Sequence, residues 1–182
     1  MENQATGTAT GQKPGMLTGL FNDKESSESA YQSLRDRGYS DNEINVIMSD
    51  DTRKKYYAND DSSELGSKAA EGTGVGGLIG GTLGAVIAGI AAIGTNLVLP
   101  GLGLVVWGPL AAALAGAGAG GLTGGLVGAL IGWGIPKDRA VAYENGIKNG
   151  GTVLGVKPRT NEDADFFEND WKTNHRGQEI HR

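Results

Sequence analysis

The chain has no cysteine and only two histidines, His175 and His181. The lack of cysteine excludes a disulfide framework, a thiolate nucleophile and a cysteine-ligated metal. Both histidines lie in polar C-terminal sequence, where we interpret them as exposed residues, and two histidines are too few ligands for structural zinc. No serine has an evident histidine partner with a third orienting group. We therefore expect no catalytic residues, no cofactor-binding residues, no metal ligands and no enzymatic activity.

An excess of basic residues is also lacking, because the net charge is −5. Nucleic-acid binding requires a basic face, so this balance argues against a nucleic-acid partner. The glycine-rich run that starts at Gly72 has no strand before it, no acid at the spacing of a dinucleotide site and no phosphate-loop lysine. No small-molecule substrate is indicated. The polar N-terminal segment 1–15 has no apolar core of a signal peptide, and we interpret it as a disordered tail.

Charge is missing altogether from the central block, residues 72–136. One membrane crossing needs about 20 residues, so a block of this length suits two. We place one helix at about 75–97, a second at 109–133, and their connection at 98–108. Trp107 and Trp133 fall near the two ends of the second helix, where indole rings are enriched at membrane–water boundaries. The alternatives for this block are a flexible glycine-rich segment or a helical pair buried in a soluble assembly.

Glycine is abundant where charge is missing: the chain has 32 glycines, and many of them recur at every fourth position of the central block. The two series are Gly72, Gly76, Gly80 and Gly84, and then Gly116, Gly120, Gly124, Gly128 and Gly132. On a helix each series forms a ridge without side chains, which is typical of close helix–helix packing in membranes. Leu126 and Leu130 follow glycines by two positions, about 200° around the helix, so we expect leucine to face lipid and glycine to face a partner helix. The sequence therefore predicts helix-packing residues and a homo-oligomer.

The polar flanks read as the two halves of one domain. Residues 16–49 predict strand, helix, strand; 50–71 predict a polar loop; 137–182 predict a linker helix followed by strand, helix, strand. Thr160 opens the last helix as the first residue of a capping-box pattern. The order βαβ, hairpin, βαβ is that of a ferredoxin-like α+β fold interrupted by a membrane insertion. Two small unrelated flanks are the alternative.

Several short motifs in the flanks resemble the bacterial general stress protein (YflT-like) domain family. They are Thr18–Asp23, Ala30–Leu34, Gly38-Tyr39-Ser40 and Ile44–Ser49, followed after the block by Gly134-Ile135-Pro136, Ala140, Tyr143, Gly146 and Gly150-Gly151. The resemblance implies a general or heat-stress context, membrane-associated members with a glycine-rich hairpin, and no catalytic residues.

Basic residues flank the central block on both sides, whereas the connection has none. The positive-inside rule then places both termini in the cytoplasm. We expect a non-enzymatic protein of the bacterial inner membrane, with the lipid bilayer as partner, acting structurally or in regulation during stress. The alternatives are a soluble, self-assembling stress protein and a pathway for small solutes or ions formed by oligomerised hairpins.

Overall fold

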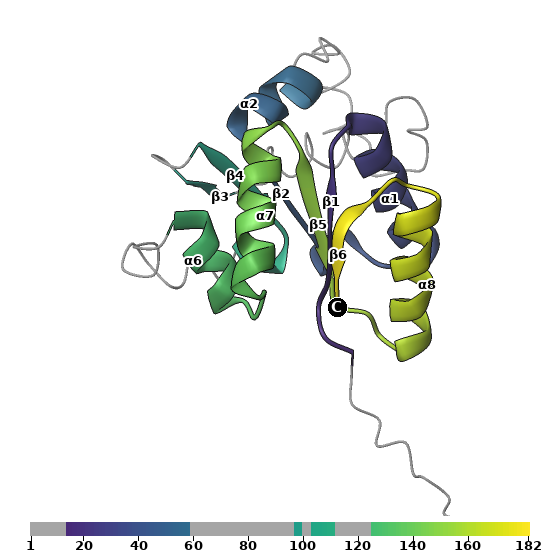
Figure 1. Ribbon diagram of the computed structural model, residues 1–182. Helices are drawn as coiled ribbons and strands as arrows, with labels where there is room; N and C mark the ends of the chain where they lie inside the picture. The colour runs from purple at the N-terminus through teal and green to yellow at the C-terminus, as the bar shows by residue number, and fades with distance from the viewer. Residues whose placement is uncertain (1–13, 59–96, 100–102, 112–124) are drawn as a thin grey trace, which may run out of the picture.

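The protein has an α+β fold in which an antiparallel sheet lies between two helical layers, as the computed structural model shows (Figure 1). The structure describes residues 14–58, 97–99, 103–111 and 125–182. The first expected membrane helix therefore falls outside the described residues except for Leu97, and so do most of the expected N-terminal tail and most of the expected polar loop.

The sheet has six strands in the order β3-β4-β2-β5-β1-β6, and all neighbours are antiparallel. The strands are β1 (Leu17–Phe21), β2 (Ile44–Ser49), β3 (Leu97–Leu99), β4 (Leu104–Trp107), β5 (Thr152–Val156) and β6 (Gln178–His181). Strand β5 lies between β2 and β1, so Leu154 is opposite both Val46 and Gly19. The two flanks of the chain are thus interleaved in one sheet.

Helices cover both faces of this sheet. On one face lie α1 (Lys24–Asp36) and α8 (Asn161–Thr173); on the other lie α6 (Gly125–Gly132) and α7 (Lys137–Lys148). Short turns of helix follow β2 as α2 (Asp50–Arg53) and η2 (Lys54–Ala58), where the sequence predicted a loop, and η1 (Asp41–Glu43) precedes β2. The Thr160 hydroxyl accepts a hydrogen bond from the Asp163 amide at 3.0 Å, which confirms the predicted start of α8.

Strands β1, β2, β4 and β5 are buried on both faces, whereas β6 at the sheet edge is exposed or half-buried. Alternate residues of the buried strands pack into different cores. In β2, Ile44, Val46 and Met48 belong to the core beneath α1 and α8, whereas Ile47 belongs to the core beneath α6 and α7. Each fully buried aliphatic side chain contributes about 1.5–3 kcal/mol of hydrophobic stabilisation. The sheet therefore contributes side chains to two apolar cores, one on each face.

The connection expected at 98–108 differs most from the structure. Instead of a loop at a membrane surface, it forms β3 and β4, and β4 pairs with β2 through Val46↔Trp107 and Ser49↔Leu104. Trp107 is only 1% exposed and lies in the core beneath α1 and α8, so its expected place at a membrane boundary is corrected. Alternation explains the change: Val105 and Trp107 fill one core while Leu104 and Val106 fill the other.

The expected continuous helix over 109–133 is also corrected. Helical backbone starts at Pro109, but α6 begins separately at Gly125, whose φ of +63° is incompatible with a continuing right-handed helix. Within the described ranges, no helix combines the length and the apolar character that a bilayer crossing demands.

Candidate functional site

Of the glycines predicted for helix packing, two lie in the part of the chain that the structure describes. Gly128 and Gly132 lie on α6. The others lie outside the described residues: Gly72, Gly76, Gly80, Gly84, Gly116, Gly120 and Gly124. The candidate site is therefore built from α6 and the elements that hold it.

Helix α6 has two contrasting sides. Leu126 and Leu130 are 4% and 0% exposed and pack into the core beneath α6 and α7. A β-carbon placed on Gly128 or Gly132 would meet no atom of the described residues within 4 Å, and the neighbouring Ile131 is 42% exposed. We call Gly128, Ile131 and Gly132 the glycine face of α6. Leucine and glycine lie on opposite sides, as their offset requires, but the leucines contact the domain where we expected lipid.

The C-terminal end of α6 is fixed by a tight turn. Gly134 adopts φ +90°, and the Ile135 amide donates to the Leu130 carbonyl at 3.0 Å. Ile135 is 4% exposed and enters the same core, with Trp133 packed partly buried against it. This turn brings α6 onto α7, so the glycine face has a defined direction away from the domain.

The start of the other apolar helical stretch is tied to the sheet by Asn45. Its side-chain oxygen accepts from the Leu110 amide at 2.8 Å, and its amide nitrogen donates to the Gly155 carbonyl at 3.2 Å. Asn45 is 3% exposed, so these bonds satisfy polar groups that would be costly to bury unpaired. The helical turn after Pro109 is therefore held to the sheet through Asn45.

A hollow of about 270 Å³ lies where the end of β2 and the start of β4 meet α6 and the C-terminal half of α7. Its lining comprises Ser49, Gly103, Leu104, Leu126, Glu144, Ile147 and Lys148. The Lys148 ammonium is 3.2 Å from the Glu144 carboxylate, so its charged members neutralise each other. Among its described lining residues, Leu104, Leu126 and Ile147 are apolar, and the two charged side chains are paired with each other.

Tyr143 connects the layer of α7 to the far edge of the sheet. Its hydroxyl donates to the Glu179 carbonyl at 2.7 Å and lies 2.8 Å from the Thr18 hydroxyl. Burial raises the pKa of Tyr143 to about 12, so the phenol stays neutral at physiological pH. Its two contacts join α7 to β1 and β6.

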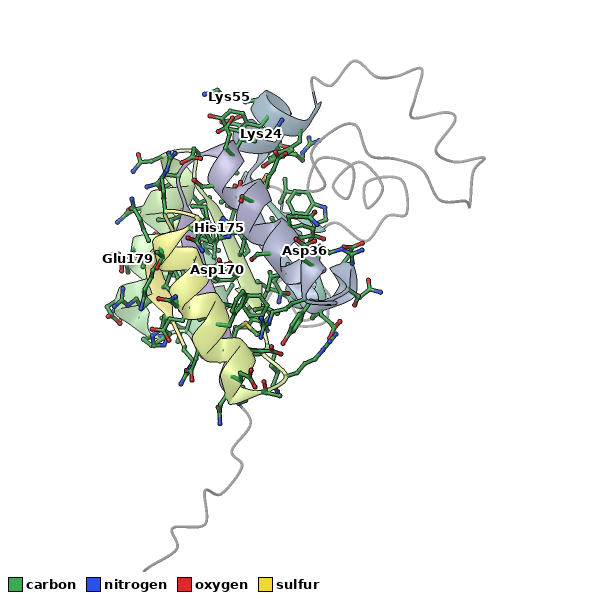
Figure 2. All side chains as sticks on the ribbon, turned by 90° about the vertical axis from the view of Figure 1, so that its right-hand side faces the viewer. Lys24, Asp36, Lys55, Asp170, His175 and Glu179 are labelled. Atoms are coloured by element: carbon green, nitrogen blue, oxygen red, sulfur yellow. The ribbon has the colours of Figure 1, made fainter. Side chains whose placement is uncertain are left out.

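His175 differs from our expectation of an exposed residue. Its Nε2 lies 3.0 Å from Asp170 Oδ2, and both side chains are only 11% exposed. Figure 2 shows the two residues together at the C-terminal end of α8, next to α1. The signal that sequence reasoning missed is an acid in the last turn of a helix, five residues before a histidine. No nucleophile contacts the ring among the described residues, and no group of three acidic, histidine or cysteine side chains there could hold a metal ion.

In the described residues, α6 packs on α7, and the turn after Pro109 is bonded to the sheet through Asn45. Comparisons with protein-family models, with curated proteins and with solved structures find no match to the chain.

Proposed function

We propose that the protein is a non-enzymatic, membrane-associated stress-response protein that self-associates through its uncharged, glycine-rich block. The resemblance of the flanks to the general stress protein domain suggests the stress context. The positions of the basic flanks support a location at the cytoplasmic side of a bacterial inner membrane.

The flanks in this proposal form a split ferredoxin-like domain. The order β2-β5-β1-β6 and the helices α1 and α8, each joining two strands of the same flank, support that description. The central block is then an insertion between β2 and α7, and β3, β4 and α6 are the parts of it that have become integrated into the domain.

The glycine face of α6 carries the proposal. A helix whose leucines are already buried and whose glycines remain open can accept a second helix at close backbone distance. Gly128 and Gly132 continue the series Gly116, Gly120 and Gly124. The residues that precede α6 in the chain therefore have the same glycine spacing and could extend the contact with a partner helix.

A soluble, self-assembling protein is the second candidate. It is favoured by one observation: Trp107, Leu126 and Leu130 all belong to the uncharged block and are buried in the domain's own cores. Under this candidate the glycine face joins copies of the chain in water, without lipid.

The test replaces Gly128 and Gly132 together by leucine. We expect the double variant to lose oligomers measured by chemical crosslinking and light scattering, because each leucine occupies the space that a partner backbone would need. Domain unfolding by urea should be unchanged or slightly more resistant, because the added side chains meet no atom and leucine favours helix over glycine.

The matched control is Asn169→Leu with Thr173→Leu, which places two leucines four positions apart on the exposed side of α8. This control should keep the wild-type oligomer size. Unchanged oligomers in the glycine variant would contradict self-association through this face. Carbonate-washed membrane fractions then separate the two candidates, because the membrane-associated form stays with the pellet and the soluble form is released.

A further inference from the structure

We infer that the chain meets the bilayer from one side only, with β3 and β4 remaining on the same side as both flanks. This inference rests on the proposed membrane association and specifies its geometry. A transmembrane hairpin would instead carry the connection at 98–108 to the opposite side of the bilayer.

The pairing of β4 with β2 is the first step. Four consecutive pairs join the strands, from Val46↔Trp107 to Ser49↔Leu104. Strand β2 is also paired with β5 of the C-terminal flank. A connection across the membrane would have to abandon this ladder, and β2 would become an open edge.

Burial gives the second step. Val105 and Val106 are 0% exposed, Trp107 is 1% and Leu104 is 5%. These side chains fill both cores of the domain, so moving β4 away would open a gap above and below the sheet.

The third step concerns the chain after β4. Gly108 adopts φ +88°, and a β-carbon there would lie 2.2 Å from the Ile44 carbonyl oxygen. Two residues later the Leu110 amide is bonded to Asn45. The backbone is thus pressed against β2 until the apolar helical stretch begins.

Chain length gives the last step. Residues 59–96 leave from η2 and return at β3, and residues 112–124 leave after Ala111 and return at α6. A stretch that returns to its own side must cross an even number of times, and two crossings need about 40 residues. The stretch 112–124 is too short for one crossing, and the uncharged part of 59–96, which starts at Gly72, suffices for only one. Neither stretch therefore has the length to cross the bilayer and return.

The absence of native cysteine allows a direct test in the full chain. Ser49→Cys with Leu104→Cys places cysteines at directly opposed positions, and both native residues line the same hollow. Opposed residues in antiparallel strands have Cα atoms about 4.5–5.5 Å apart, within the range of a disulfide. Membrane fractions are oxidised with copper phenanthroline, and the intramolecular disulfide is read as a shift in gel mobility.

We expect the disulfide in most membrane-bound molecules. The positive control is Thr18→Cys with His181→Cys, which joins opposed positions in the two flanks under either topology. A disulfide in this control but none in the Ser49–Leu104 pair would overturn the inference. A chain found only in the soluble fraction would overturn membrane association itself, and with it the one-sided contact.

A second variant guards against a folding defect in the first. Gly103→Cys adds an exposed thiol between β3 and β4; a β-carbon there meets no atom of the described residues, and the φ of +60° adds some backbone strain. Asp165→Cys marks the C-terminal flank. In intact cells an impermeant maleimide should label neither thiol, and after permeabilisation it should label both. Labelling of the Gly103→Cys variant alone in intact cells would place β3 and β4 outside and overturn the inference.

Discussion

Gly108 and Gly134 have almost the same backbone conformation but opposite surroundings. Their φ values are +88° and +90°, in the left-handed region that disfavours side chains. At Gly108 a β-carbon would lie 2.2 Å from the Ile44 carbonyl oxygen and 2.9 Å from Asn45 Oδ1, whereas at Gly134 it would meet no described atom within 4 Å. Replacing each glycine by alanine therefore separates two effects on stability: the strain of a left-handed backbone, present at both positions, and a steric clash, present only at Gly108.

We expect Gly134→Ala to lower the free energy of unfolding by about 1–2 kcal/mol, the cost of a left-handed conformation for a residue with a side chain. Gly108→Ala should cost clearly more, because it adds a clash that requires β2 or the turn to shift. Urea denaturation of both variants measures the difference. Equal decreases in the free energy of unfolding would contradict this prediction, because they would mean that the clash at Gly108 is relieved without loss of stability.

Asn45 and His175 show where reasoning from the sequence stops at this scale. Asn45 reads as the polar residue of an alternating strand, and nothing near it indicates its bond to Leu110, because the two residues are distant in the chain. His175 was assigned to exposed sequence because its neighbours are polar. Its burial depends on how the end of α8 packs, which local composition does not determine.

Whole elements of the flanks were predictable where local signals agree. The linker helix, strand, helix and strand predicted within 137–182 are α7, β5, α8 and β6, and α8 begins after its predicted cap at Thr160. The second half of that capping box differs, because Asp163 accepts hydrogen bonds from Tyr39 and Arg37. Strand β4 was missed because an apolar run is compatible with a buried strand and with a membrane segment. The valines and tryptophan between Gly103 and Gly108 were the signal for a strand.

The short helix η1 has a capping box that should respond to acid. Hydrogen bonds from the Ser40 backbone amide and then from its hydroxyl, with a smaller effect of Arg159, lower the pKa of Glu43 to about 2. A depressed pKa in the folded state stabilises the fold above the unfolded pKa, and this stabilisation is lost as the pH falls towards the folded value. We expect wild-type stability to decline from about pH 5 to about pH 2, with a partial contribution from Glu43 because its side chain is 40% exposed.

The comparison variant for this prediction is Glu43→Gln, which keeps an acceptor oxygen but cannot titrate. It should be less stable than wild type at pH 7 and close to wild type near pH 2, measured by urea midpoints across the range. A constant difference between the two proteins at all pH values would contradict the assigned role of Glu43.

At the scale of the whole molecule, the two flanks are inseparable parts of one sheet. Strands β1 and β2 come from the N-terminal flank, and β5, inserted between them, comes from the C-terminal flank. The sequence predicted one split domain from the order of elements. It did not predict that the central block also contributes strands, because pairing with β2 is a long-range property.

We expect the two halves to remain together after the backbone is cut between them. A specific protease site inserted within 60–70 should yield two fragments that co-elute in gel filtration, because β2 is paired with both β4 and β5. The uncut protein with the same insertion is the control. Fragments that separate in native buffer would contradict the interleaved sheet.

Because β5 pairs with β1 and β2, the sheet cannot be completed until β5 has been synthesised. The ribosome completes β2 at Ser49 but does not reach Thr152 until the whole uncharged block has been made. At synthesis rates of about 5–20 residues per second, this interval is on the order of 5–20 s. During this interval β1 and β2 lack β5, the strand that pairs with both. The uncharged block 72–136 is therefore synthesised before the sheet can be completed. A nascent chain of this kind meets whatever apolar surface is nearest to the ribosome before it meets its own C-terminal half.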